Sequence, residues 1–193
     1  MFLDICSFSQ RASEKKEDQE VLLRVMNLFF TEMIRIAEDY GGTVEMNTGD
    51  GLMAYFEDGG EHTAVGCQRA VAAALTMLYV NRNAISSILI REGIEPMQFR
   101  LGIDYGQVTV ARLGAAKRFN SLVAIGTRAN VACKMLAHAS PGEMLVGEDV
   151  VHQLPAQWKN YCKLKVENTG WVRVESQRSY PFFVFDGRWI EPV

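Results

Sequence analysis

Two aspartates in this sequence could do chemistry together, Asp4 and Asp50. Asp4 interrupts an apolar run at residues 1–6, and Asp50 lies in the turn Thr48-Gly49-Asp50-Gly51 between two apolar runs. A glycine beside an aspartate is typical of a tight hairpin turn, so the turn alone explains Asp50. Asp4 needs another explanation, because a carboxylate buried on a strand without a partner costs several kcal/mol. We therefore expect an arginine, a helix N-terminus or a metal ion beside Asp4.

The two carboxylates converge if their strands are neighbours in one sheet. Carboxylates held side by side repel each other, and bound divalent cations relieve that repulsion. A site built from oxygen ligands alone selects hard ions such as Mg²⁺ or Mn²⁺. From spacing alone, a structural salt bridge of Asp4 remains the alternative to a metal site.

The segments around these residues predict an α+β fold in one domain spanning residues 1–193. Apolar residues recur at helical spacing over residues 17–40 and 63–89, and shorter helices are expected at 127–138 and 147–154. Strands are expected at residues 1–6, on both sides of the Asp50 turn, and at 97–104, 107–111, 121–125, 144–146, 162–174 and 180–185. A second hairpin should turn at Tyr105-Gly106, followed by a loop at 113–120. This order predicts a ferredoxin-like βαββαβ core, a mostly antiparallel sheet that is covered by helices and extended at the C-terminus.

Composition and charge argue against several classes of protein. The chain has 193 residues, of which 48% are hydrophobic, so it is long enough for one domain with a sizeable core. Its net charge of -3 and its lack of a basic stretch give no sign of a nucleic-acid partner. We expect no membrane-spanning helix and no signal peptide. The four cysteines form no Cys-x-x-Cys pair, which indicates reduced thiols in a cytoplasmic protein.

Several segments resemble the motifs of the class III nucleotidyl cyclases. Phe2-Leu3-Asp4-Ile5-Cys6-Ser7-Phe8-Ser9 is similar to the first metal motif, in which a strand aspartate precedes small residues and an aromatic residue. Asn47-Thr48-Gly49-Asp50-Gly51-Leu52-Met53-Ala54 is similar to the second, a Gly-Asp hairpin. The resemblance continues in unbroken order to about residue 150, through the Arg-Leu-Gly-Ile strand in 99–108, Lys117-Arg118-Phe119, the Gly-Thr-Arg-Ala-Asn segment in 125–134, and 139–146.

This resemblance implies an enzyme that converts a nucleoside triphosphate into a 3′,5′-cyclic monophosphate and releases pyrophosphate. Asp4 and Asp50, with the main-chain carbonyl of Ile5, would hold two Mn²⁺ or Mg²⁺ ions. Attack of the ribose 3′-hydroxyl on the α-phosphorus then needs positioning and charge stabilisation more than covalent help from the protein.

In the family that this chain resembles, the site lies between two subunits. The resemblance implies that Arg118 contacts the phosphates from the chain that holds the metal ions. Asn130 of the other chain would orient the ribose, and Lys134 of that chain would occupy the transition-state position. A homodimer would carry two such sites, and a monomer is expected to be inactive.

Three positions depart from the family pattern. Lys134 stands where the family usually has arginine, so the charge is kept but the planar fork is lost; a solvated helix lysine is the alternative explanation. The base-selecting positions are Met46 and Val123, and neither side chain can read a purine edge through hydrogen bonds. An apolar pair fits a smaller base or leaves base selection to other groups.

These departures leave several interpretations open. The favoured one is the bacterial pyrimidine cyclase branch of the Pycsar antiphage systems, which makes cyclic UMP or cyclic CMP for a separate effector protein. The others are an atypical adenylate cyclase, a silent pseudo-cyclase that only dimerises, and an ordinary ferredoxin-like protein in which Asp4 is structural. Because a core strand rarely begins at the first residue, we also expect a fragment or numbering from an internal methionine.

Overall fold

The main sheet has seven strands, in the order β2-β3-β1-β4-β7-β9-β8. The computed structural model describes residues 1–11, 13–46, 49–59, 65–116, 119–167, 169–173 and 176–189, without the side chains at 46, 112–116 and 119–124. The strands of the sheet are β1 (Phe2–Ile5), β2 (Thr43–Met46), β3 (Gly51–Tyr55), β4 (Phe99–Ile103), β7 (Met144–Gly147), β8 (Cys162–Leu164) and β9 (Phe182–Phe185). Neighbouring strands are antiparallel except β4 and β7, which are parallel. The predicted α+β class with a mostly antiparallel sheet is confirmed.

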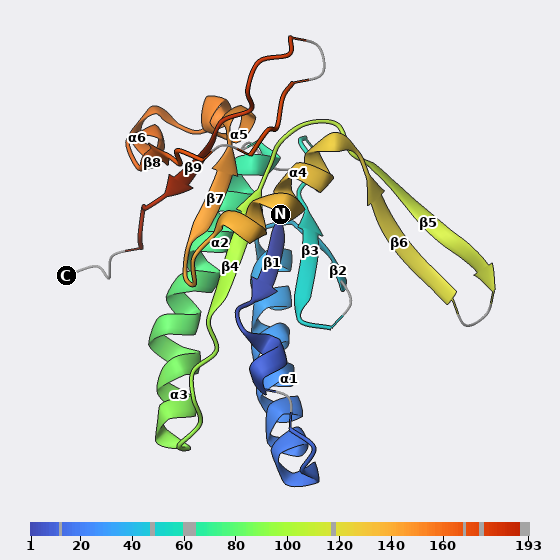
Figure 1. Cartoon of the computed structure of the whole chain (residues 1–193), viewed down its shortest axis with the longest axis vertical. Coiled ribbons are helices and arrows are strands. Elements are labelled where there is room, and N and C mark those ends of the chain that lie inside the picture. The colour runs from blue at the N-terminus through green and yellow to red at the C-terminus, as the bar shows by residue number, and fades with distance from the viewer. Residues whose placement is uncertain are drawn as a thin grey trace.

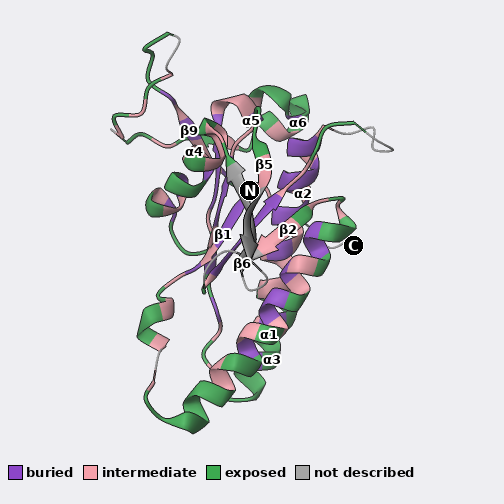
Figure 2. Cartoon of the chain, turned by 90° about the vertical axis from the view of Figure 1, so that its right-hand side faces the viewer, coloured by how far each residue is buried: buried purple, intermediate pink, exposed green. Residues whose placement is uncertain are grey.

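Helices cover both faces of this sheet. The helical elements are η1 (Phe8–Arg11), α1 (Lys16–Asp39), α2 (Gly66–Val80), the π-helical η2 (Asn81–Ile85), α3 (Ser86–Arg91), α4 (Thr127–Met135), η3 (Leu136–His138), α5 (Glu148–Gln153) and α6 (Ala156–Lys159). Figures 1 and 2 show α1, α2 and α3 on one face and α4 on the other. The helix predicted at 17–40 is confirmed, and it ends before Gly41, whose φ of 71° stops it.

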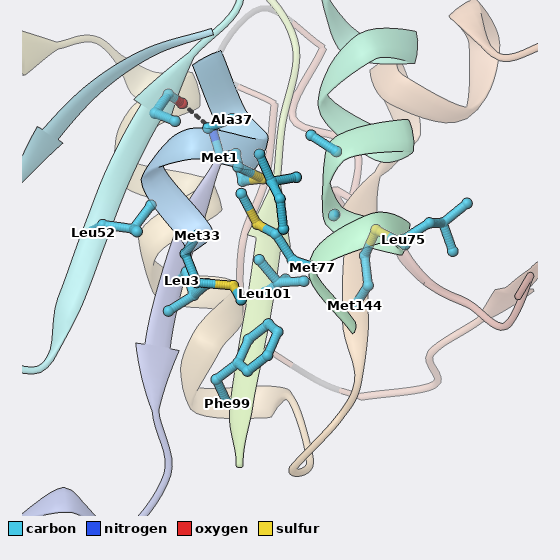
Figure 3. Packing of buried hydrophobic residues seen from close by; sticks show 14 of the residues in the cluster. Met1, Leu3, Met33, Ala37, Leu52, Leu75, Met77, Phe99, Leu101 and Met144 are labelled. Carbon is cyan, nitrogen blue, oxygen red and sulfur yellow. Dashed lines mark hydrogen bonds between the residues drawn. The ribbon is translucent and has the colours of Figure 1, made fainter. Parts of the chain in front are cut away.

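The core lies between β1, β4 and the helices α1 and α2. Met33 of α1 and Met77 of α2 are fully buried, and they point toward Leu3 of β1 and Leu101 of β4 (Figure 3). Along α1 the buried residues recur three or four positions apart, which gives the helix one apolar stripe facing the sheet. This packing fixes β1 and β4, the two strands that carry the acidic and basic side chains discussed below.

The predicted hairpin around Tyr105-Gly106 is wrong. Both edges of β4 are taken, by β1 and β7, so no return strand can pair with it. The chain instead leaves the sheet, and β5 (Thr109–Ala116) pairs with β6 (Phe119–Ile125) in a separate two-stranded sheet. Figure 1 shows this hairpin projecting away from the main sheet. The loop predicted at 113–120 is therefore largely strand.

Two further predictions change in extent. The helix predicted at 63–89 begins at Gly66 within the described residues and continues through η2 and α3 to Arg91. The predicted C-terminal strands are shorter than expected, since only β8 and β9 and the single bridge Val172–Ser179 form ladders in the described part of that region. No helix in the described ranges is both long and apolar enough to cross a membrane.

Candidate active site

Asp4 and Asp50 lie on neighbouring strands, as the sequence predicts. Asp4 is opposite Gly51 in the antiparallel pair of β1 and β3, and Asp50 directly precedes β3. The main-chain nitrogen of Ile5 donates a hydrogen bond of 3.0 Å to the carbonyl oxygen of Asp50. The strands are very close here, because a Cβ atom on Gly51 would lie 2.7 Å from the carbonyl oxygen of Leu3. The fold thus brings Asp4, Ile5 and Asp50 together at one end of β1.

Asp4 has a cationic partner within the chain, Arg100 on β4. Register places the two residues opposite each other, and Nε and Nη2 of Arg100 lie 2.9 and 2.7 Å from Oδ2 of Asp4. The side chains are 22% and 31% exposed for Asp4 and Arg100. An arginine was one of the three partners expected for Asp4. Sequence reasoning did not single out Arg100, because the pair is 96 positions apart and only the pairing of β1 with β4 reveals it.

The oxygen atoms of Asp4, Asp50 and the Ile5 carbonyl nevertheless suit a hard divalent cation. Both of these contacts from Arg100 go to Oδ2, and Oδ1 of Asp4 accepts no hydrogen bond from the described residues. No cluster of three or more His, Cys, Asp or Glu in the described ranges could hold a metal ion. A cation would therefore depend on Asp4, Asp50 and the Ile5 carbonyl, with substrate phosphates and water completing its shell, an arrangement typical of Mg²⁺.

Asn130 and Lys134 occupy the exposed face of α4. The two residues are four positions apart, so they share one face, whereas Ala132 and Met135 are buried against the sheet. Burial, and after it the negative charge of Asp4, raises the pKa of the Cys133 thiol, which lies next to Lys134 on this helix. Within the described residues no hydrogen bond or ion pair joins Asn130 or Lys134 to Asp4 or Asp50. One chain thus presents these two side chains outward.

The remaining predicted site residues are only partly visible. Arg118 lies outside the described residues. Met46 pairs with Leu52 at the end of β2, and Val123 pairs with Ala111 in the β5–β6 hairpin, but the two predicted base-selecting side chains lie outside the description.

A second polar cluster, which the sequence did not indicate, surrounds Asp104 just after β4. We call it the Asp104 network, and its members are Asp104, Arg128, Glu148, Asp149, Arg173 and Tyr180. The Asp104 side chain is fully buried, and its Oδ1 accepts hydrogen bonds from the Tyr180 hydroxyl at 2.6 Å and the Tyr105 main-chain nitrogen at 2.9 Å. Burial raises the pKa of Asp104 to about 6. Asp104 and Arg128 also line a cavity of about 280 Å³.

Comparison with known families decides what kind of domain this is. Residues 1–187 match the family described as the Adenylate and Guanylate cyclase catalytic domain. The chain belongs to this family. The predicted class III nucleotidyl cyclase resemblance is thereby confirmed, and the cyclase domain occupies nearly the whole chain.

Individual relatives of the cyclase domain differ in the base that their names specify. A cytidylate cyclase of Staphylococcus aureus is 24% identical over 180 residues, which cover 92% of this chain and 42% of the relative. A uridylate cyclase of Rhodovulum sp. (strain MB263) is 26% identical over 136 residues, 70% of this chain and 55% of the relative. The chain therefore spans about half the length of these curated relatives.

A solved structure supports the fold of the cyclase domain. The adenylyl cyclase CyaB from P. aeruginosa superposes with a TM-score of 0.76 at 25% sequence identity, over 97% of this chain and 92% of that one. The predicted fold type is confirmed by this similarity.

Proposed function

We propose that this cyclase domain converts a nucleoside triphosphate into a 3′,5′-cyclic nucleoside monophosphate and pyrophosphate. The observation that carries the proposal is the convergence of Asp4, Ile5 and Asp50 at the end of β1. Two oxygen ligands on adjacent strands, backed by a main-chain carbonyl, suit the divalent ions of two-metal phosphoryl chemistry. Membership of the family supports the same reaction class.

In this reaction the ribose 3′-oxygen attacks the α-phosphorus, a new P–O bond forms, and the bond to pyrophosphate breaks. Bound Mg²⁺ or Mn²⁺ would lower the pKa of the 3′-hydroxyl and neutralise charge on the triphosphate. Asp4 and Asp50 would hold the ions, and Arg118 would contact the phosphates. Asn130 would orient the ribose, and Lys134 would pair with an α-phosphate oxygen as negative charge develops there.

We place the complete site between two copies of the chain. Asn130 and Lys134 face outward on α4, so they are available to the Asp4–Asp50 site of a second copy. A homodimer would then hold two composite sites, whose two metal ions are bound by one chain and whose ribose is oriented by the other. The single domain would span residues 1–193.

A pyrimidine nucleotide is the substrate that we propose. Met46 and Val123 at the base-selecting positions offer no hydrogen bonds to a purine, and two relatives carry the names cytidylate and uridylate cyclase. The product would then be cyclic UMP or cyclic CMP, made in the cytoplasm and read by a separate effector protein in antiphage defence.

The test is incubation of the protein with ATP, GTP, CTP and UTP separately in the presence of Mn²⁺, followed by chromatography. We expect a cyclic pyrimidine nucleotide and pyrophosphate. The rate at which they form should fall at least about a hundredfold in Asp4→Asn and in Asp50→Asn. Asp39→Asn removes an exposed carboxylate on α1 and serves as the matched control, with full activity. A product from ATP alone would identify an adenylate cyclase, and full activity in either site variant would refute the two-metal assignment.

A second candidate function follows from the ion pair between Asp4 and Arg100. If Arg100 is the permanent partner of Asp4, the domain is a silent module that dimerises without turnover. The two functions differ in their response to Mn²⁺, because a ligand that binds only the folded state raises its stability. A rise in melting temperature with Mn²⁺ that disappears in Asp50→Asn supports the enzyme, and no rise supports the silent module.

A further inference from the structure

Arg128 ties the first turn of α4 to three other parts of the fold. Its Nη2 lies 2.7 Å from Oδ2 of Asp149 at the start of α5, and its Nη1 lies 3.7 Å from Oδ2 of Asp104 after β4. Its guanidinium carbon lies 5.3 Å from the centre of the Tyr180 ring, which is within the range of a cation–π contact. The side chain thus reaches from α4 to β4, α5 and the segment before β9.

Asp104 needs this contact more than an exposed carboxylate would. Its side chain has no exposed surface, and Oδ2 has no hydrogen-bond partner among the described residues. The guanidinium of Arg128 faces Oδ2, whereas Tyr180 and Tyr105 donate hydrogen bonds to Oδ1. A buried carboxylate pays a large cost for lost hydration, so it attracts the guanidinium to one place.

The path of the Arg128 side chain is also restricted by packing. A Cβ atom on Gly106 would lie 2.8 Å from Cγ of Arg128, so the aliphatic stem passes directly over this glycine. Only a residue without a side chain leaves room for it. The stem and the guanidinium are therefore both held, and the Cα of Arg128 with them.

Besides Arg128, the first half of α4 is attached through Ala129, which is half-buried against the cluster of Phe2, Met53 and Ala132. The fully buried residues of this nine-residue helix are Ala132 and Met135, both in its second half. The N-cap position is Gly126, which provides no side-chain cap. Asn130 lies in this first half, two positions beyond Arg128. A shift of that turn would move Asn130 without unfolding the domain.

We propose that Arg128 is a positioning residue, which fixes the first turn of α4 and thereby places Asn130 for the reaction. The proposal rests on the function proposed above, in which Asn130 orients the ribose. Arg128 does not touch the substrate in this scheme; it acts through the helix. Small displacements of a positioning group can cost large factors in rate while substrate binding is kept.

The Asp104 network contains a matched control, Arg173. Its guanidinium also contacts Asp149, at 2.8 Å, and lies 4.9 Å from the centre of the same Tyr180 ring. Arg173, however, belongs to the segment before β9, and the hydrogen bonds and ion pairs of its side chain to the described residues go to Glu148 and Asp149 rather than to α4. Removing either arginine takes a cation away from Asp149 and from the Tyr180 ring, whereas Arg173 also pairs with Glu148 and only Arg128 belongs to α4.

The test compares Arg128→Met, Arg128→Lys and Arg173→Met in the full chain. We expect kcat for the nucleoside triphosphate to fall at least about tenfold in Arg128→Met, with KM close to wild type, because methionine keeps the stem over Gly106. The melting temperature should fall as well, because Asp104 loses the cation that faces it. Arg128→Lys keeps one ionic contact and should recover part of kcat. Arg173→Met should stay within about twofold of wild type. Equal losses in the two methionine variants, or an unchanged kcat in Arg128→Met, overturn the proposal.

Hydrogen–deuterium exchange of residues 126–135 gives a readout that does not depend on turnover. Faster exchange in Arg128→Met than in Arg173→Met supports the positioning role, and equal exchange overturns it. If the wild-type protein makes no cyclic nucleotide, the proposed function fails, and exchange alone still decides whether Arg128 holds the first turn of α4.

Discussion

Asp104 shows how one buried residue can link stability to pH. Its neighbours include two hydrogen-bond donors and Arg128, all of which favour the charged form, yet loss of hydration outweighs them. The pKa rises from 3.8 to about 6 in the folded protein. The folded state therefore binds a proton more tightly than the unfolded chain. Stability from this group is fully present below pH 3.8 and is lost as the pH rises through about 6.

The first prediction concerns Asp104→Asn, which removes this titration and keeps the shape of the side chain. Between pH 4.5 and 7.5, the free energy of unfolding of wild type should fall relative to the variant by about 2 kcal/mol, because only wild type must ionise a buried carboxyl group. Chemical denaturation at the two pH values measures the difference. Asp39→Asn on α1 serves as the control and should follow wild type. A gap between wild type and Asp104→Asn that does not change with pH would contradict the assignment.

Single residues also show where sequence reasoning succeeds and fails. The proximity of Asp4 and Asp50 could be predicted, because a hairpin signal and a short apolar run define two strands that share a core. The contact of Asp4 with Arg100 could not be predicted, because it depends on which strand pairs with the second edge of β1. The Asp104 network could not be predicted for the same reason. Its members are spread over residues 104–180, and no local sequence pattern marks them.

At the scale of elements, α4 rests on β4 through very close backbone contact. A Cβ atom on Gly102 would lie 2.2 Å from the carbonyl oxygen of Ala132, an atom that cannot rotate away. The glycine is thus required by packing, and the exposed face that carries Asn130 and Lys134 depends on it.

The second prediction concerns Gly102→Ala, which should push α4 away from the sheet. We expect a loss of stability of about 1–3 kcal/mol from overpacking, together with a fall in cyclic nucleotide formation. Denaturation and turnover assays measure the two effects. Ala137→Ser, an exposed change just beyond α4, is the control and should alter neither. Wild-type stability in Gly102→Ala would show that α4 is free to move over β4.

Elements were predictable wherever the local pattern agreed with the sheet. The long helix α1 and the β2–β3 hairpin follow from apolar periodicity and turn residues. The hairpin expected at Tyr105-Gly106 was wrong, although its local turn signal is sound. β4 pairs with β1 on one edge and with β7 on the other, so no edge is left for a return strand. The sequence around Tyr105-Gly106 cannot show that both edges of β4 are already paired.

At the scale of the whole molecule, the proposed site is divided between two chains. Asp4 and Asp50 lie together near one end of β1, while Asn130 and Lys134 face away from the chain on α4. Two different inactive variants should therefore repair each other when they share a dimer.

The third prediction is that mixing Asp50→Asn with Asn130→Ala restores activity. One of the two sites in each mixed dimer would contain only wild-type residues, so an equimolar mixture should reach about a quarter of wild-type activity after subunit exchange. Pyrophosphate release measures it, and each variant alone provides the baseline. Mixing Asp50→Asn with Asp4→Asn is the matched control, because both changes fall on the same half-site and leave every site damaged. No gain in the first mixture would place the whole site within one chain.

The β5–β6 hairpin has a consequence for solubility. In the described structure its two strands pair only with each other, so each has an outer edge of main-chain donors and acceptors that is open to further strands. Open edges of this kind promote aggregation. Ile125 at the end of β6 is 56% exposed and adds an apolar side chain beside that edge. The hairpin is therefore a place at which copies of this chain can pair strand to strand and precipitate.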